Sequence, residues 1–215
     1  MLIASASRRW PDGRGMCALW ARWRFPVCIA LVAAALQAAG WNEALRYESA
    51  ALAHGQWWRL LSANFVHLGW VHLVRDLAAL FIIWLGFSDC LGERAWAGLF
   101  LCTALAVTVG LYLFVPHVHW YVGLSGILYG CVVCVGLLLW SSRPWLGTAM
   151  AVGATALALY GVLAGPLPGQ ALGLGARVIP QAHLLGAIGG LGFALAYALW
   201  RRRKASARAS EAPHR

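Results

Sequence analysis

Residues 121–130 read YVGLSGILYG, and they begin a stretch of about 20 residues without a charged side chain. A run of roughly this length is enough to cross the hydrocarbon core of a membrane as a helix. Ser125 lies near the start of the run, between Gly123 and Gly126. A serine in a membrane helix either hydrogen-bonds back to the preceding turn or serves as a nucleophile. The rest of the sequence has to distinguish these two roles.

The overall composition indicates a membrane protein. The 215 residues are 61% hydrophobic and 11% charged, whereas soluble domains carry roughly 25% charged residues. The formal net charge of +10 comes largely from Arg and Lys residues near the two ends of the chain. That distribution is typical of the cytoplasmic segments of a multi-pass membrane protein. The excess of positive charge therefore does not indicate a nucleic-acid partner.

The apolar runs predict an all-α bundle of six transmembrane helices. They fall near 24–40, 67–87, 95–115, 122–141, 145–164 and 181–200. An even number of spans places both basic termini in the cytoplasm. Residues 1–23 then form a basic cytoplasmic arm, 24–200 the six-helix domain, and 201–215 a basic, disordered tail.

The segments between the predicted spans are short, and two of them stand out. The tryptophan-rich segment 41–66 is expected to lie on the outer membrane surface. Segment 165–180 is rich in Gly and Pro and fits a mobile flap or a plain apolar connector equally well. Inside the fourth span, Cys131 and Cys134 are spaced as CxxC, and small-residue packing explains them better than redox or metal chemistry.

Three polar side chains from three predicted spans lie at the same depth. His72, Ser125 and His183 are each within roughly 3 to 8 Å of the outer end of their helix, at 1.5 Å rise per residue. Ionisable groups inside a membrane are costly and mark functional sites. A shared depth is not expected for scattered polar residues, so it favours a common site at the outer face.

Glycine spacing predicts that the fourth and sixth spans approach closely. Gly126 and Gly130 form a GxxxG pattern in one span, and Gly186 and Gly190 follow His183 on one face of the other. Small residues at this spacing allow membrane helices to pack tightly. Close packing is also what a hydrogen bond between Ser125 and His183 requires.

A serine and a histidine in contact are sufficient for nucleophilic catalysis, since the histidine takes the hydroxyl proton and returns it to the leaving amine. The oxyanion that forms on a substrate carbonyl needs hydrogen-bond donors. His72 and the backbone N–H of Ser125, in the first turn of its helix, are candidates. Asp76 shares a helical face with His72. His67 is about 140° around the helix from His72 and is expected to point elsewhere.

Taken together, these patterns resemble the rhomboid family of intramembrane serine proteases over roughly residues 58–190. The GxSG motif appears as Gly123-Leu124-Ser125-Gly126, with Tyr129 four residues later. The sixth span carries Ala182-His183 followed by Gly186 and Gly190, and the second span carries His67, His72 and Asp76. The outer segment carries Trp58-Arg59.

The resemblance implies a Ser125–His183 catalytic dyad, Tyr129 packed on the histidine ring, and His72 in the oxyanion hole. Gly123 and Gly126 would support the site, and Gly130, Gly186 and Gly190 would pack the helices. The family has Asn where this chain has Asp76, and an ionised carboxylate would repel an oxyanion. Asp76 is then held protonated by burial, neutralised by a partner, or turned away from the oxyanion.

Within the family, the six-span form without a soluble domain is most similar to the rhombosortase branch. That similarity implies transmembrane substrates, namely exported proteins with a C-terminal Gly-Gly motif, an apolar helix and a basic end, cut near the periplasmic face. The product would be a free acid or a chain transferred to an amine. No cofactor or metal is expected. A general bacterial rhomboid protease that cuts other transmembrane segments is the nearest alternative.

A different class of protein, a small proton-coupled transporter, would use His72, Asp76 and His183 as a proton relay. Such a relay predicts polar groups along the whole depth of the bundle, whereas here they concentrate at one end. An intramembrane metalloprotease would need ligands such as HExxH, which the sequence lacks. The sequence does not indicate an oligomeric state.

Overall fold

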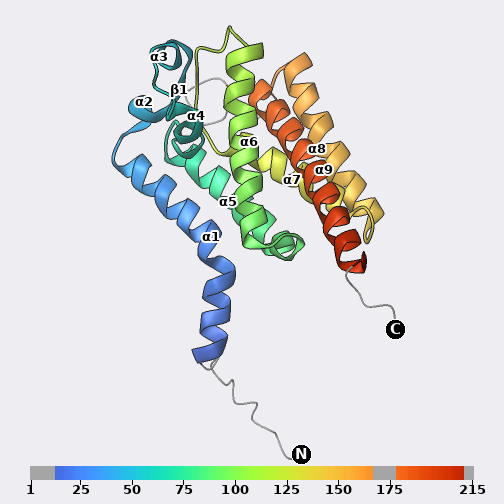
Figure 1. The fold of residues 1–215 in the computed structure, drawn as a ribbon. Helices are drawn as coiled ribbons and strands as arrows, with labels where there is room; N and C mark the ends of the chain where they lie inside the picture. Colours follow the sequence, from blue (N-terminus) through green and yellow to red (C-terminus); the bar gives the residue numbers. More distant parts are fainter. Residues whose placement is uncertain (1–12, 167–177, 211–215) are drawn as a thin grey trace, which may run out of the picture.

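The computed structural model describes residues 13–166 and 178–210 of the chain. Its longer helices lie on the six apolar ranges of the sequence and run side by side (Figure 1): α1 (Gly13–Ala38), α5 (Trp70–Phe87), α6 (Glu93–Phe114), α7 (Ser125–Leu139), α8 (Pro144–Ala164) and α9 (Pro180–Ser210). The first and last helices point their free ends to the same side of the bundle.

The short elements gather at the opposite end of the bundle (Figure 1). They are α2 (Asn42–Leu45), β1 (Tyr47–Glu48), α3 (Ser49–Ala53), α4 (Arg59–Ser62) and β2 (Trp120–Tyr121), with 3-10 turns at Ala63–Phe65 and, near the other end, Ser88–Cys90. Strands β1 and β2 pair antiparallel, with Tyr47 opposite Tyr121. The buried guanidinium of Arg59 donates to the carbonyl oxygens of Glu43 (2.9 Å) and Arg46 (2.7 Å). This segment is therefore held together by hydrogen bonds and fixes the residues that precede α7.

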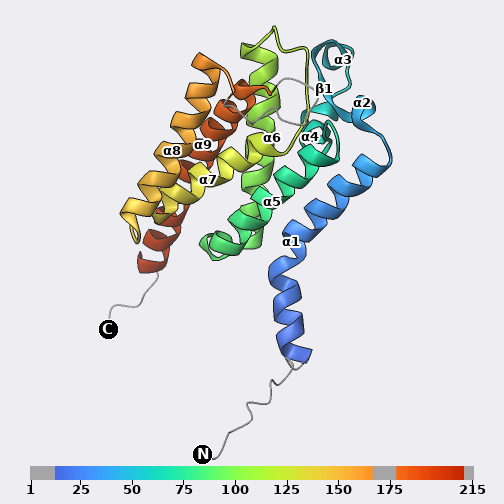
Figure 2. The same ribbon diagram turned by 180° about the vertical axis from the view of Figure 1, so that it is seen from behind.

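Helix α7 is the central element. It packs against α9, α8, α6 and α5, and Figure 2 shows it between them in the middle of the bundle. Cys131 and Cys134 are both buried in its contacts with neighbouring helices. A helix surrounded on all sides has no polar face to display. This explains why its sequence is apolar throughout and lacks amphipathic periodicity.

Four described helical segments are long and apolar enough to cross a membrane: Trp70–Cys90, Glu93–Phe114, Pro144–Ala164 and Pro180–Arg208. Helix α7 has 15 residues, which span about 22 Å at 1.5 Å per residue, less than the roughly 30 Å of a hydrocarbon core. The protein is therefore a mostly helical, multi-pass membrane protein. The total of six spans, and with it the boundaries of the six-helix domain at 24–200, stays a prediction.

The terminal segments differ from the sequence-based expectation. Residues 201–210 were expected in a disordered tail, but they continue α9 as helix. This segment is rich in Ala, Arg and Lys, which favour helix, and extension of an existing helix avoids the cost of nucleation. The expected arm is helical from Gly13 onward. Most of the candidate flap, residues 167–177, lies outside the described residues.

Candidate active site

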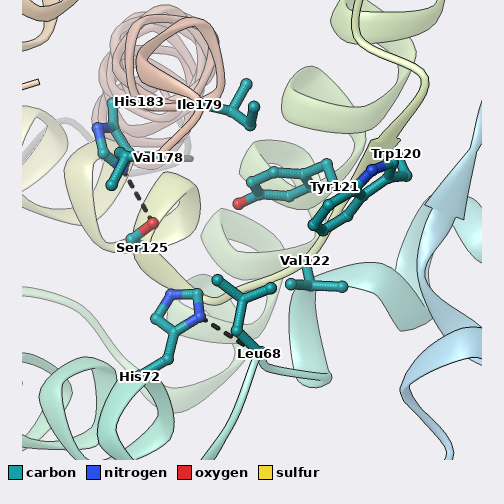
Figure 3. A pocket seen from close by; sticks show the side chains of 9 residues that line it. All are labelled: Leu68, His72, Trp120, Tyr121, Val122, Ser125, Val178, Ile179 and His183. Carbon is teal, nitrogen blue, oxygen red and sulfur yellow. Dashed lines mark hydrogen bonds between the residues drawn. The ribbon is translucent and has the colours of Figure 1, made fainter. Parts of the chain in front are cut away.

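The site is built around Ser125, the first residue of α7. Its Oγ lies 3.0 Å from Nε2 of His183 on α9, and Figure 3 shows the two side chains facing each other. His183 is 8% exposed. A hydrogen bond of this length joins a nucleophile to its general base in serine hydrolases. Ser125 and His183, for which the sequence predicts the same depth in the membrane, are thus in contact.

Glycines make this contact sterically feasible. A Cβ on Gly186 would collide with the carbonyl oxygen of Gly126, and one on Gly190 with that of Gly130. A Cβ on Gly130 would lie 2.6 Å from the carbonyl oxygen of Gly186. The backbones of α7 and α9 therefore approach more closely than any residue with a Cβ allows. The hydrogen bond between Ser125 and His183 depends on that approach.

Tyr129, one turn after Ser125, lies against the ring of His183. The two ring centroids are 4.4 Å apart and the planes differ by 9°. A stacked aromatic neighbour restricts the rotation of the imidazole. The arrangement holds the His183 ring so that Nε2 stays directed at Ser125.

His72 on α5 reaches the same site from the opposite side (Figure 3). Its Nδ1 accepts a hydrogen bond from the backbone N–H of Leu68 at 3.4 Å. In a neutral imidazole whose Nδ1 accepts, the proton is on Nε2. His72 therefore presents an N–H donor toward Asp76 and the region beside Ser125, as an oxyanion donor requires.

Asp76 lies at the amino-terminal end of α7. Its Oδ2 accepts from the backbone N–H groups of Leu124 (2.8 Å) and Ser125 (3.1 Å) and is 3.5 Å from Nε2 of His72. A carboxylate at a helix amino terminus is favoured by the helix dipole and the unpaired N–H groups. The Ser125 N–H expected to serve an oxyanion is thus bound to Asp76 in this state.

The expectation for His67 is wrong. Its side chain is fully buried and its Nε2 is 3.2 Å from Oδ2 of Asp76. Its ring packs edge-on against His72, with the centroids 5.0 Å apart. Helix α5 begins at Trp70, so His67 lies in the segment before the helix. The separation of about 140° from His72, which assumes that both residues are helical, therefore does not apply. Both histidines therefore face the one carboxylate.

Tyr121 also belongs to the site, although it lies outside the motifs that predict the other site residues. Its side chain is buried, and its hydroxyl donates to the carbonyl oxygen of Gly123 at 2.7 Å. It lies on β2, outside the helices, so neither depth nor helical periodicity could place it. A polar aromatic residue two positions before the glycine of GxSG was the available signal.

Two hollows meet at Ser125. A small cavity of about 40 Å³ is lined by Ser125, His72 and His183 together with Tyr121, Val122 and Ile179, as seen in Figure 3. A wider, mostly apolar groove of about 480 Å³ runs between α5, α7 and α8, with Asp76, Ser125 and Tyr129 in its lining. Ser125 is thus reachable from the apolar face of the bundle. Over 13–166 and 178–210, no cluster of three or more His, Cys, Asp or Glu residues is arranged to hold a metal ion.

Comparison with known proteins gives a consistent assignment. The family model described as Rhomboid domain matches residues 54–202. The candidate rhomboid protease YdcA of Bacillus subtilis (strain 168) is 24% identical over 90 residues, which cover 42% of this chain and 45% of YdcA. Rhomboid protease GluP of the same organism is 27% identical over 85 residues, which cover 40% of this chain and 16% of GluP.

The chain thus spans less than half the length of the curated relatives it matches. The family model, in contrast, covers more than half of this chain and includes Ser125, His183, His72 and Asp76. The chain belongs to the rhomboid family.

Proposed function

We propose that the protein is an intramembrane serine endopeptidase with a Ser125–His183 dyad. The observation that carries the proposal is the 3.0 Å hydrogen bond between Ser125 Oγ and His183 Nε2. The membership of the rhomboid family and the proteases among its relatives support the same activity. The polar groups at one end of the bundle favour a peptidase over a transporter, because a relay would need them along its depth.

The proposed reaction uses the contact between Ser125 and His183. Ser125 Oγ attacks the carbonyl carbon of the scissile bond while its proton passes to His183 Nε2. The tetrahedral intermediate collapses, the C–N bond breaks, and His183 returns the proton to the leaving amine. Water, deprotonated by His183, then hydrolyses the acyl-enzyme and releases a free acid. An amine in place of water would give transfer.

The oxyanion needs donors beside Ser125, and His72 Nε2–H and the Ser125 N–H are the nearest candidates. Asp76 holds the second of these in the structure. Productive binding then requires Asp76 to be neutral or to turn away from the Ser125 N–H. Gly123 allows the close approach, since a Cβ there would lie 2.7 Å from His72 Cε1.

The proposed substrates are membrane-anchored proteins cut near the outer, periplasmic face. The groove between α5, α7 and α8 is mostly apolar and reaches Ser125, which suits a transmembrane segment. The cavity beside Ser125 is about 40 Å³, which suits a small residue at the scissile bond, such as the Gly of a C-terminal Gly-Gly anchor. These features support the rhombosortase-like reading.

A general rhomboid protease is the second candidate. The small cavity also fits Ala or Ser, and the curated relatives are named only as rhomboid proteases. On this reading the chain cuts other transmembrane segments and needs no Gly-Gly motif. The fold and the dyad are common to both candidates.

The test is co-expression with two reporters, one with a Gly-Gly anchor tail and one with an unrelated transmembrane segment. Ser125→Ala and His183→Ala should abolish cleavage. Ser142→Ala and His54→Ala replace exposed residues of the same types outside the dyad and should leave cleavage unchanged. Equal cleavage by wild type and both dyad variants would reject the dyad. Cleavage of the unrelated reporter alone would reject the Gly-Gly preference.

A further inference from the structure

The Tyr121 hydroxyl donates a hydrogen bond to the Gly123 carbonyl oxygen, next to Ser125. The ring is 3% exposed, and the hydrogen bond measures 2.7 Å. The pairing of β2 with β1 fixes the backbone of Tyr121 opposite Tyr47. Figure 3 shows the phenol oxygen pointing from β2 toward Ser125. The strand pairing therefore holds the backbone of Tyr121, and the hydroxyl at the other end of the side chain points at the Gly123–Leu124 peptide.

That peptide is held at both ends. Its carbonyl oxygen accepts from Tyr121, and its N–H, on Leu124, donates to Asp76 Oδ2 at 2.8 Å. Because a trans peptide is planar, its C=O and N–H point in opposite directions. The Tyr121 hydrogen bond on one side therefore fixes the direction of the Leu124 N–H on the other.

The Leu124 N–H points at Oδ2 of Asp76. Together with the Ser125 N–H it converges on one carboxylate oxygen, that of Asp76. An oxyanion formed on Ser125 would lie beside the same pair of donors. The direction of the peptide thus decides whether one or two backbone N–H groups face that charge.

Gly123 makes such a constraint necessary. Its φ is +121°, a conformation that only glycine adopts readily, and glycine also leaves the following peptide free to rotate. The Gly123 N–H donates to the carbonyl oxygen of Ala63 at 3.1 Å, which fixes the preceding peptide but not the Gly123–Leu124 peptide. The Tyr121 hydroxyl supplies the missing restraint on the carbonyl.

The phenol is suited to act as a permanent donor. Burial raises the pKa of Tyr121 above its ordinary value, and the nearby Asp76 charge raises this pKa further. The hydroxyl consequently keeps its proton throughout the physiological pH range. A phenylalanine would fill the same space without the donor.

We propose that Tyr121 is a positioning residue for the protease: its hydroxyl locks the Gly123–Leu124 peptide so that the Leu124 N–H faces the oxyanion of the Ser125 reaction. The proposal rests on the proposed peptidase function. It adds a residue outside the dyad, from the paired strands at the outer end of the bundle, to the machinery that prepares the site.

The first measurement compares Tyr121→Phe with Tyr47→Phe in the full chain, reconstituted in lipid vesicles with a cleavable reporter. Tyr47 is a matched control because it is the strand partner of Tyr121, is fully buried, and its hydroxyl has no hydrogen-bond partner in the described part of the chain. Tyr121→Phe should lower kcat about tenfold, the effect of losing one hydrogen bond, with KM unchanged. Tyr47→Phe should leave both unchanged.

The second measurement separates positioning from general damage. A tetrapeptide aldehyde, ending in the residue before the scissile bond of the cleaved reporter, forms a hemiacetal with Ser125 whose oxygen lies at the oxyanion position. The matched alcohol fills the same pocket without this bond. Tyr121→Phe should weaken inhibition by the aldehyde about tenfold and leave inhibition by the alcohol unchanged. The ratio of the two does not depend on the folded fraction of the variant.

The outcomes distinguish the two levels of the proposal. Wild type that cleaves no reporter overturns the peptidase function and, with it, the role of Tyr121. Active wild type with an unchanged aldehyde-to-alcohol ratio in Tyr121→Phe overturns the role of Tyr121 alone. If Tyr121→Phe weakens inhibition by the aldehyde and by the alcohol equally, Tyr121 only shapes the pocket. That result also rejects positioning of the peptide.

Discussion

Oδ2 of Asp76 lies 3.1 Å from the backbone nitrogen of Ser125 and accepts its N–H. The carboxylate also accepts the N–H of Leu124 and has Nε2 atoms of His67 and His72 within 3.5 Å. The Asp76 carboxyl group already occupies the donors that the oxyanion of a tetrahedral intermediate at Ser125 would use. Donors that must first be freed contribute less to catalysis than donors that are preorganised and vacant.

Replacement of Asp76 by Asn should therefore raise activity. The amide has the same shape, carries no negative charge to repel the oxyanion, and offers an N–H to it. We expect kcat to rise about fivefold to tenfold, less than the roughly 100-fold to 1000-fold that one preorganised oxyanion donor supplies. Initial rates of reporter cleavage in lipid vesicles measure this effect.

The control for this change is Asp76→Ala, which removes both the charge and the acceptor. It leaves the Leu124 and Ser125 N–H groups without a side-chain partner, and such a loss costs about 1–3 kcal/mol in stability. Asp76→Ala should thus melt at a lower temperature and gain less activity than Asp76→Asn. A fall in activity in Asp76→Asn would mean that the carboxylate is required, and would contradict this interpretation.

Gly186→Ala should separate α7 from α9. The added Cβ would collide with the carbonyl oxygen of Gly126, and overpacking of this kind costs about 1–3 kcal/mol. Because the same contact brings His183 to Ser125, cleavage should fall together with the melting temperature. Gly192→Ala is the matched control on the same helix, since a Cβ there meets nothing within 4 Å. Equal effects of the two variants would show that helix approach at Gly186 is unimportant.

Gly123→Ala should lower both the melting temperature and the rate of cleavage. The backbone φ of +121° strains any other residue, at about 1–3 kcal/mol, and the Cβ would also press on His72 at 2.7 Å. Gly55→Ala separates these effects, because Gly55 has a φ of +86° but open space around its Cβ position. Melting temperatures should fall in both variants, whereas kcat should fall only in Gly123→Ala. Loss of activity in Gly55→Ala as well would point to general strain.

The parts of the site that lie on helices could be anticipated from the sequence. Hydropathy gives the outer ends of these helices to within a few residues, and 1.5 Å per residue then gives a shared depth for His72, Ser125 and His183. Glycine spacing indicates which two helices approach closely, and the structure brings Ser125 and His183 to 3.0 Å.

The parts outside the helices could not be anticipated. His67 and Tyr121 lie in a turn and a two-residue strand, where neither depth nor periodicity gives a direction. Their positions follow from tertiary contacts, which a single sequence does not specify. The predicted span 122–141 is longer than α7 (Ser125–Leu139) for a related reason. The residues that flank a helix buried on every side are apolar too, so hydropathy does not mark where the helix stops.

Tyr129→Ala should impair catalysis through His183. The tyrosine ring stacks on the imidazole with the centroids 4.4 Å apart, and contacts between aromatic rings contribute about 0.5–1.5 kcal/mol. Without the ring, Nε2 would face Ser125 for a smaller fraction of the time, so kcat should fall about threefold to tenfold. Tyr160→Ala removes an exposed tyrosine from α8 and should leave kcat unchanged. The reaction of Ser125 with a fluorophosphonate probe, which requires the activated hydroxyl, should slow in parallel with cleavage in Tyr129→Ala. An unchanged rate of labelling would mean that the stack does not orient His183.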